Sequence, residues 1–168
     1  MELDPILLRL DKLITTSRLK DIAYIVDTDI VQRLTKMSKV FESIRPGAYL
    51  LGSGPSTVGI IPLTVEEITI GRSATILEEP SDTIIDYAVT DMTYFTPREV
   101  SRAHAKIVRI EAEEGREFHI VDLGSKCGTF INGKQVLSES DGTMLSHGDV
   151  ISLGSSMVST YMFYVKGQ

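Results

Sequence analysis

The sequence has few of the residues on which several classes of protein depend. It contains one cysteine, Cys127, and no tryptophan among its 168 residues. A single cysteine excludes an internal disulfide and a zinc site built from several cysteines, so we expect an intracellular chain. No apolar run approaches the roughly 18 residues of a membrane-spanning helix. The first residues also lack the basic and apolar regions of a signal peptide. We therefore expect no membrane partner.

Positive charge is scarce in most of the chain. The formal net charge is −6, and it is unevenly spread. Residues 1–45 hold eight Lys and Arg against seven Asp and Glu, whereas residues 46–168 hold nine against sixteen. Proteins bind nucleic acids mainly by neutralising phosphates, so a body this acidic argues against a nucleic-acid partner. If the protein binds phosphate, it must do so with a few local donors.

Glycine is absent from the first 46 residues, and this absence divides the chain. All 13 glycines lie at or beyond Gly47. Before that point, apolar residues recur at three- and four-residue steps over residues 3–14 and 30–44, which is typical of amphipathic helices. The linking residues 21–27 fit either a helix or a strand. We predict an amphipathic helical extension over residues 1–45, which must pack on the rest of the chain, on itself or on another chain.

Short β-branched segments separated by turn residues dominate residues 46–168. The pair Asn132-Gly133 is a strong turn signal, because both central residues of a type I′ hairpin turn need a positive φ. Many short strands at regular spacing predict a mainly β protein with a two-sheet β-sandwich. The expected strands are residues 66–70, 83–89, 103–110, 117–123, 128–131, 134–137, 150–153 and 160–165.

The usual signatures of catalysis and metal binding are missing. Cys127 has no histidine beside it, and His104, His119 and His147 do not have the spacing of metal ligands. Residues 52–56 are glycine-rich, but no helix signal follows them, so a turn is favoured over a phosphate-binding loop. We therefore expect no enzymatic activity, no metal and no cofactor.

Four fragments, each at the end of an expected strand, resemble one known family when taken in order. They are Gly71-Arg72-Ser73, Ser101-Arg102-Ala103-His104, residues 122–133 (DLGSKCGTFING) and residues 147–154 (HGDVISLG). Together they resemble the forkhead-associated (FHA) family over roughly residues 48–167. The resemblance implies an FHA-like sandwich over residues 46–168. Loops at one end of it would bind phosphothreonine in a partner protein, such as a Ser/Thr kinase or its substrate.

The resemblance also implies a role for individual residues. Arg72 presents a planar fork of donors that suits a phosphate, and Ser101 contributes a hydroxyl. Arg102 and Lys126 add charge, and Cys127 stands where the family usually has an asparagine that bonds the main chain of the peptide. His104 is expected to be a neutral imidazole that braces the binding loops. The residues expected to support the site are Gly71, His104, Gly128, Asn132 and Gly133.

Two departures from the family pattern keep a second hypothesis open. A thiol is a weak donor and a poor acceptor, so losing the amide clamp at Cys127 costs about 1–2 kcal/mol of binding. The stretch from Arg72 to Ser101 is also longer than usual, and residues 90–97 are expected to form an enlarged loop beside the site. The alternative is a phosphate-independent scaffold that binds its partner through the sheet or long-loop surfaces, or that forms a homo-oligomer through residues 1–45.

Overall fold

Two helices precede eleven strands in the part of the chain that the structure describes. A computed structural model describes residues 4–17, 30–53, 57, 59–72, 84–89, 98–113, 115–136 and 141–167. Helix α1 spans Pro5–Ser17 and helix α3 spans Ile30–Ser43, where helical periodicity predicts them. Asp4 caps α1, because its Oδ1 accepts a hydrogen bond from the Ile6 N–H at 2.8 Å. Residues 21–27 lie outside the described residues.

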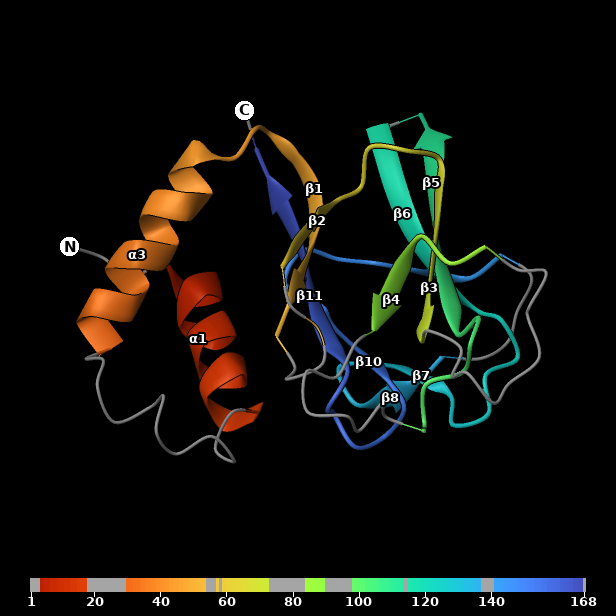
Figure 1. The fold of residues 1–168 in the computed structure, drawn as a ribbon. Helices are drawn as coiled ribbons and strands as arrows, with labels where there is room; N and C mark the ends of the chain where they lie inside the picture. The colour runs from red at the N-terminus through yellow and green to blue at the C-terminus, as the bar shows by residue number, and fades with distance from the viewer. Residues whose placement is uncertain are drawn as a thin grey trace.

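The strands form two sheets that pack face to face, as the sequence predicts (Figure 1). Every strand pair is antiparallel except β3–β4, which is parallel. The six-stranded sheet has the order β2 (Ile60–Pro62), β1 (Gly47–Gly52), β11 (Thr160–Lys166), β10 (Val150–Leu153), β7 (Thr129–Ile131) and β8 (Lys134–Gln135). The five-stranded sheet has the order β4 (Tyr87–Val89), β3 (Glu67–Arg72), β5 (Ala105–Ala112), β6 (Gly115–Asp122) and β9 (Thr143–Met144).

The predicted strands match the observed ones unevenly. Strand β10 has the predicted bounds, and Asn132 and Gly133 form the predicted turn with φ values of 50° and 82°. Strand β4 is shorter than the predicted 83–89, because only Tyr87–Val89 pairs with β3. Strands β1, β2 and β9 were not predicted. In β1 three consecutive residues are buried, so the alternating pattern of a half-buried strand is missing.

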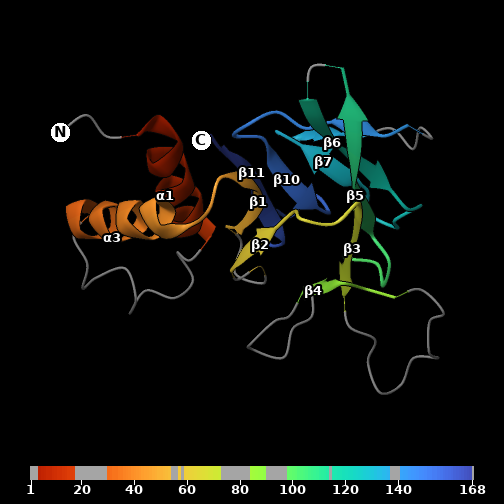
Figure 2. The same cartoon turned by 90° about the horizontal axis from the view of Figure 1, so that it is seen from above.

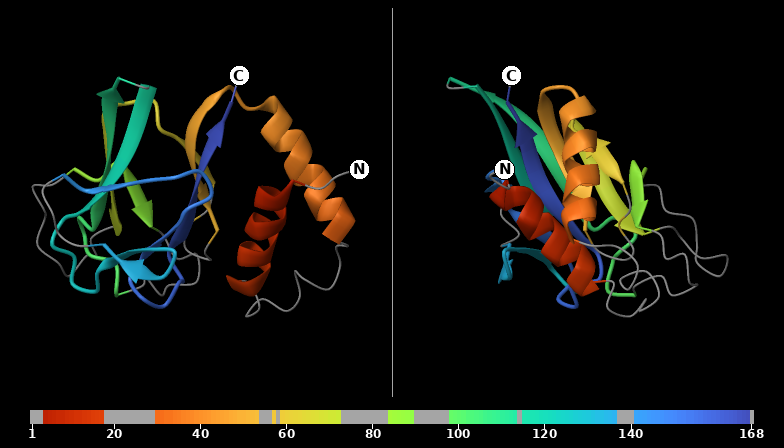
Figure 3. Two further views of the ribbon diagram at one scale, coloured as in Figure 1. Left: turned by 180° about the vertical axis from the view of Figure 1, so that it is seen from behind. Right: turned by 90° about the vertical axis from the view of Figure 1, so that its left-hand side faces the viewer.

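The reason for this pattern in β1 is that both faces of the six-stranded sheet are covered. One face packs on the other sheet, where Leu50, Ile120 and Phe163 are almost fully buried. The other face carries the two helices, and α1 and α3 lie over the β1–β11 side of the sandwich (Figures 2 and 3). The residues of this second apolar cluster are Leu7, Leu10, Leu34 and Phe41 from the helices, and Tyr49, Leu51, Val150 and Met162 from the sheet.

Polar contacts fix both helices to the sheet. The Lys166 ammonium donates to the carbonyl oxygens of Phe41, Glu42 and Ile44 at 2.6, 3.0 and 2.7 Å, so a cation caps the C-terminus of α3. From α1, the Arg9 guanidinium donates to the carbonyl oxygen of Gly148 at 2.8 Å.

None of the described helices is long and apolar enough to cross a membrane. The division into units 1–45 and 46–168 stays a prediction.

We expect the full chain to be monomeric, because its own sheet covers the apolar faces of α1 and α3. A chain shortened to residues 46–168 would expose Tyr49, Leu51 and Met162 to water, and it should associate or aggregate. Light scattering on the two chains measures this difference. A full chain that is dimeric, and becomes monomeric when residues 1–45 are removed, would instead show that the extension is an oligomerisation element.

Candidate functional site

Three segments meet at one end of the sandwich: the end of β3 at Arg72, residues 101–104 before β5, and residues 123–128 after β6. We call this region the loop junction. The Arg72 N–H donates to the Ser101 carbonyl oxygen at 3.1 Å. The Lys126 N–H donates to the Ser101 Oγ at 3.0 Å. Ser101 therefore ties together two segments that are 25 residues apart in sequence, and Arg72 is next to it.

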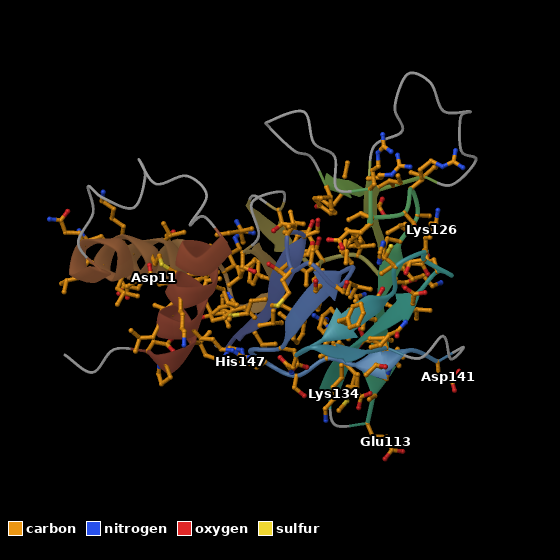
Figure 4. The ribbon with its side chains drawn as sticks, turned by 90° about the horizontal axis from the view of Figure 1, so that it is seen from below. Asp11, Glu113, Lys126, Lys134, Asp141 and His147 are labelled. Atoms are coloured by element: carbon orange, nitrogen blue, oxygen red, sulfur yellow. The ribbon has the colours of Figure 1, made fainter. Side chains whose placement is uncertain are left out.

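Polar groups of the loop junction remain available to a ligand. The Ser101 hydroxyl accepts a hydrogen bond from the main-chain N–H of Lys126, and no acceptor for its own hydrogen is found among the described residues. The Lys126 side chain is exposed and lies on the side of the sandwich away from the helices (Figure 4). Cys127 is exposed and carries a free thiol. Arg102 is half-buried, in the same segment as Ser101. The junction thus presents a hydroxyl hydrogen and an ammonium group at its surface.

His104 joins the two loops from the inside. Its side chain is fully buried. Its Nδ1 accepts the Ser101 N–H at 3.0 Å, so in the neutral ring Nε2 carries the hydrogen and donates to the Gly128 carbonyl oxygen at 3.1 Å. Burial lowers the pKa of His104, although the hydrogen bond with Gly128 and the charges of Asp122 and Glu99 oppose that effect. A neutral imidazole therefore holds the loop junction together.

We expect His104 to remain neutral at pH values where an ordinary histidine becomes protonated. Its pKa in the folded chain lies below 6.5, so the unfolded chain takes up this proton first as the pH falls. The contribution of His104 to stability should therefore decrease as the pH falls below about 6.5 towards the folded pKa. The ¹⁵N NMR shifts of the imidazole, followed from pH 8 to 5, report this directly. A midpoint at or above 6.5 would contradict the arrangement.

Asp122, which was not among the predicted site residues, braces the loop that carries Lys126. Its carboxylate accepts hydrogen bonds from the Ser125 N–H at 2.9 Å, the Ser125 hydroxyl at 2.5 Å and the Thr129 hydroxyl at 2.6 Å. Burial raises the pKa of Asp122, but these hydrogen bonds outweigh burial and bring the pKa below its usual value. An aspartate followed three residues later by a serine is a local turn signal that could have identified it.

Two glycines of the loop junction are required by its geometry. A Cβ atom at Gly71 would lie 1.8 Å from the Arg102 carbonyl oxygen, so only glycine lets β3 pass this close to the neighbouring loop. Gly128 has a φ of +78°, which disfavours residues with a side chain. Its carbonyl oxygen accepts hydrogen bonds from both His104 and the Gly154 N–H.

Asn132 and Gly133 form a turn whose contacts run towards α1. The Asn132 Oδ1 accepts hydrogen bonds from the Val150 N–H at 3.0 Å and from Arg9 at 3.1 Å. Its Nδ2 donates to Asp149 at 2.7 Å. Among the hydrogen bonds described, none joins this turn to Ser101 or Lys126. The supporting role of Asn132 and Gly133 in the site therefore stays a prediction.

Glu99 ties the loop junction to the turn between β10 and β11. Its carboxylate accepts hydrogen bonds from the N–H of Ser156, at 3.2 Å, and from the Ser156 hydroxyl. Its side chain packs so closely on Gly154 that a Cβ there would lie 2.5 Å from the Glu99 carboxyl carbon. The expected enlarged loop at residues 90–97 lies outside the described residues.

Comparisons with known proteins agree with this fold. The family model described as FHA domain matches residues 68–154. The structure is similar to the FHA domain of CT664 from Chlamydia trachomatis, with 21% identity over 71% of this chain and 98% of that one (TM-score 0.51). It is also similar to the yeast splicing factor Pml1, with 14% identity over 79% of this chain and 91% of that one (TM-score 0.57). No curated protein matches the sequence significantly.

A third similar structure contains a bound peptide. It is the MEK1 FHA domain in complex with a phosphothreonine peptide of HOP1, with 20% identity over 73% of this chain and 100% of that one (TM-score 0.51). The TM-scores of these structures show the shared fold, and the family match covers more than half of the chain. The chain belongs to the FHA domain family, whose members are protein-interaction modules, generally for phosphothreonine, rather than enzymes.

Proposed function

We propose that this protein is an intracellular, phosphothreonine-dependent interaction module that binds phosphorylated partner proteins at its loop junction. One observation carries the proposal: the main-chain N–H groups of Lys126 and Arg72 donate to the hydroxyl and carbonyl oxygens of Ser101, which brings these three residues together at one end of an acidic body. The partner is a threonine-phosphorylated protein, such as a kinase or its substrate. The residues proposed to bind the phosphopeptide are Arg72, Ser101, Arg102, Lys126 and Cys127.

These side chains suit the chemistry of a phosphothreonine. The modified residue carries about −1.5 to −2 charges and three strong acceptor oxygens. A guanidinium, a hydroxyl with an unused hydrogen and an ammonium group all donate to such oxygens. Each charge-assisted hydrogen bond contributes about 1.5–3 kcal/mol net. Three or four of them, less the cost of association, give an affinity on the order of micromolar.

The structure around the loop junction supports a preorganised anion site. Glu99 and Asp122 are nearby carboxylates, and both accept hydrogen bonds from neighbouring serine groups. The buried His104 fixes the distance between the Ser101 and Gly128 segments before any ligand arrives. Less conformational entropy is then lost on binding, which favours affinity.

A library of phosphothreonine peptides panned against the full chain tests the proposal. We expect selected peptides to bind with micromolar affinity and their unphosphorylated versions not to bind measurably. A phosphoserine version of the same peptide should bind about fivefold more weakly, because a small pocket for the threonine methyl group is worth roughly 1 kcal/mol. Equal binding of the phosphorylated and unphosphorylated peptides would overturn the proposal and favour the phosphate-independent scaffold.

Replacing Cys127 with asparagine should strengthen peptide binding. Cys127 is exposed at the loop junction, so an amide there can reach a bound peptide and bond its main chain. We expect the Cys127→Asn variant to bind a selected phosphopeptide about tenfold more tightly, measured by isothermal titration calorimetry. The Cys127→Ser variant is the control, and its affinity should stay close to that of the natural chain. An unchanged affinity in Cys127→Asn would show that the peptide main chain does not pass this residue.

A further inference from the structure

A cavity of about 840 Å³ lies at the end of the sandwich opposite to the loop junction. The turn between β5 and β6 and the C-terminus of β11 lie at this end, whereas β7 and β8 lie at the other (Figure 1). We call it the distal cavity. Its volume falls in the range of cavities that hold small ligands. None of the residues proposed to bind phosphopeptide lines it.

Most of the wall of the distal cavity is apolar and comes from both sheets. Tyr49 and Phe163 line it from the six-stranded sheet, and Phe118 lines it from the five-stranded sheet. Met144 and Val165 also line it and are 54% and 42% exposed, so apolar surface continues to the mouth. Apolar side chains left open to water in this way are typical of a surface that binds something.

The side chains on the inner face of the five-stranded sheet change from apolar to charged towards this cavity. Inward-facing residues of a sandwich are normally apolar, and alternate residues of a strand share a face. Along β5 the inward position after the buried Ile107 is Arg109. Along β6 the inward position before the buried Phe118 is Arg116. Both arginines line the cavity, so the apolar interior gives way to guanidinium groups at its mouth.

Positive charge is in excess around the distal cavity. Arg45, Arg109 and Arg116 line it, and Glu117 is the carboxylate among the lining residues. A second carboxylate, Glu111, lies between two of the guanidinium groups, 3.4 Å from the Arg109 Nε and 3.3 Å from the Arg116 Nε. The three arginines around the cavity therefore outnumber the two glutamates there by one, in a chain whose net charge is −6. One anionic group of a ligand would balance this set.

The hydrogen bonding around Arg109 is also incomplete. Its Nη1 donates to the Thr64 carbonyl oxygen at 2.9 Å. Its Nε is buried and forms an ion pair with Glu111 at 3.4 Å, but it has no hydrogen-bond partner among the described residues. On the outer face, the Glu117 carboxylate accepts a hydrogen bond from the His119 Nε2 at 3.1 Å. His147, which lines the cavity beside the helices (Figure 4), accepts the Val165 N–H at 2.9 Å.

We propose that the distal cavity binds a small amphiphile with an extended apolar body and one carboxylate. The apolar body would displace water from the apolar wall of the cavity, where the side chains of Met144 and Val165 are exposed. The carboxylate would meet the arginines at the mouth and supply the charge that Glu111 and Glu117 leave unbalanced. Such a ligand would bind independently of phosphothreonine, because the two sites lie at opposite ends of the sandwich.

Calorimetric titration of the full chain with three ten-carbon probes tests this inference. They are sodium decanoate, decyltrimethylammonium bromide and 1-decanol, each kept below the concentration at which it aggregates. We expect decanoate to bind saturably at one site, at least tenfold more tightly than the cation and several-fold more tightly than the alcohol. Chemical shifts in NMR spectra should change at Phe118 and Met144 and not at Ser101 or Lys126. Equal binding of the anionic and cationic probes, no saturation, or shifts confined to the loop junction would overturn the proposal.

Variants separate the arginines from general hydrophobic binding. The double variant Arg45→Gln with Arg116→Gln leaves the Arg109 contact with Thr64 in place. It should bind decanoate about tenfold more weakly and 1-decanol unchanged. The control Lys134→Gln removes an exposed cation from β8, at the other end of the molecule (Figure 1), and should not change decanoate binding. Thermal unfolding establishes that each variant is folded. An unchanged decanoate affinity in the folded double variant would refute a carboxylate site at these arginines.

Discussion

Replacing Arg72 with alanine is expected to weaken binding of a phosphothreonine peptide by about 100-fold, because two charge-assisted hydrogen bonds are worth about 3 kcal/mol. The variant should also lose the preference for the phosphorylated over the unphosphorylated peptide. Arg72 is the last residue of β3, and its N–H is bonded to the Ser101 carbonyl oxygen at the loop junction. Alanine keeps that backbone hydrogen bond and removes only the guanidinium. Calorimetry with the matched peptide pair measures both effects.

The matched control for Arg72→Ala is Arg116→Ala, which removes an arginine from the opposite end of the sandwich. Arg116 makes an exposed ion pair with Glu111, and such pairs contribute little to stability. Its phosphopeptide affinity should equal that of the natural chain. If Arg72→Ala is folded and still prefers the phosphorylated peptide by the full margin, Arg72 does not bind the phosphate. If neither form of the peptide binds even the natural chain, the proposed function itself fails.

Replacing Gly71 with alanine is expected to lower the free energy of unfolding by at least about 3 kcal/mol, because it forces two backbone segments apart. The new Cβ would lie 1.8 Å from the Arg102 carbonyl oxygen and 3.0 Å from the Ser101 carbonyl oxygen. Both neighbours are backbone atoms, so no side chain can rotate away. The loop must move by more than an ångström, on the order of 1.5 Å, for a normal contact. Urea denaturation followed by circular dichroism measures the loss.

Gly167→Ala is the control for this substitution, because nothing lies within 4 Å of a Cβ at that glycine. Its unfolding free energy should differ from that of the natural chain by less than about 0.5 kcal/mol. Where Gly71→Ala remains folded, its phosphopeptide affinity should fall as well, because the displaced Ser101 no longer accepts the hydrogen bond from the Lys126 N–H in the same position. A Gly71→Ala variant as stable as Gly167→Ala would contradict the close packing of β3 on the loop junction.

Local sequence signals predicted much of the fold. The pair Asn132-Gly133 specifies its turn because two adjacent positive φ values suit few other residue pairs. The apolar spacing predicted both helices, and the order of the strand-end fragments predicted the family. Strand β1 could not be read in this way, because its exposure depends on α1 and α3 covering the outer face of the sheet. Strands β2 and β9, of three and two residues, are too short to show a period.

The candidate site was predictable as a set of residues, but its geometry was not. The likeness of four fragments to one family predicted Arg72, Ser101 and Lys126 as site residues. It did not show that Ser101 accepts the Lys126 N–H, a contact that spans 25 residues. Asp122 is the first residue of one of these fragments, but its bracing role was not predicted, because its three hydrogen bonds exist only when the 122–129 segment is folded.

The sequence alone determines the local conformations, the net negative charge and the types of hydrogen-bond donor in this protein, because these depend on neighbouring residues and on composition. Only the tertiary structure decides that His104 is buried as a neutral bridge, that Gly71 must be glycine, and that Arg109 and Arg116 face an apolar cavity. Each of these depends on atoms that are distant in sequence. Burial, close approach and charge pairing arise when the two sheets and the helices pack, and no short segment contains them.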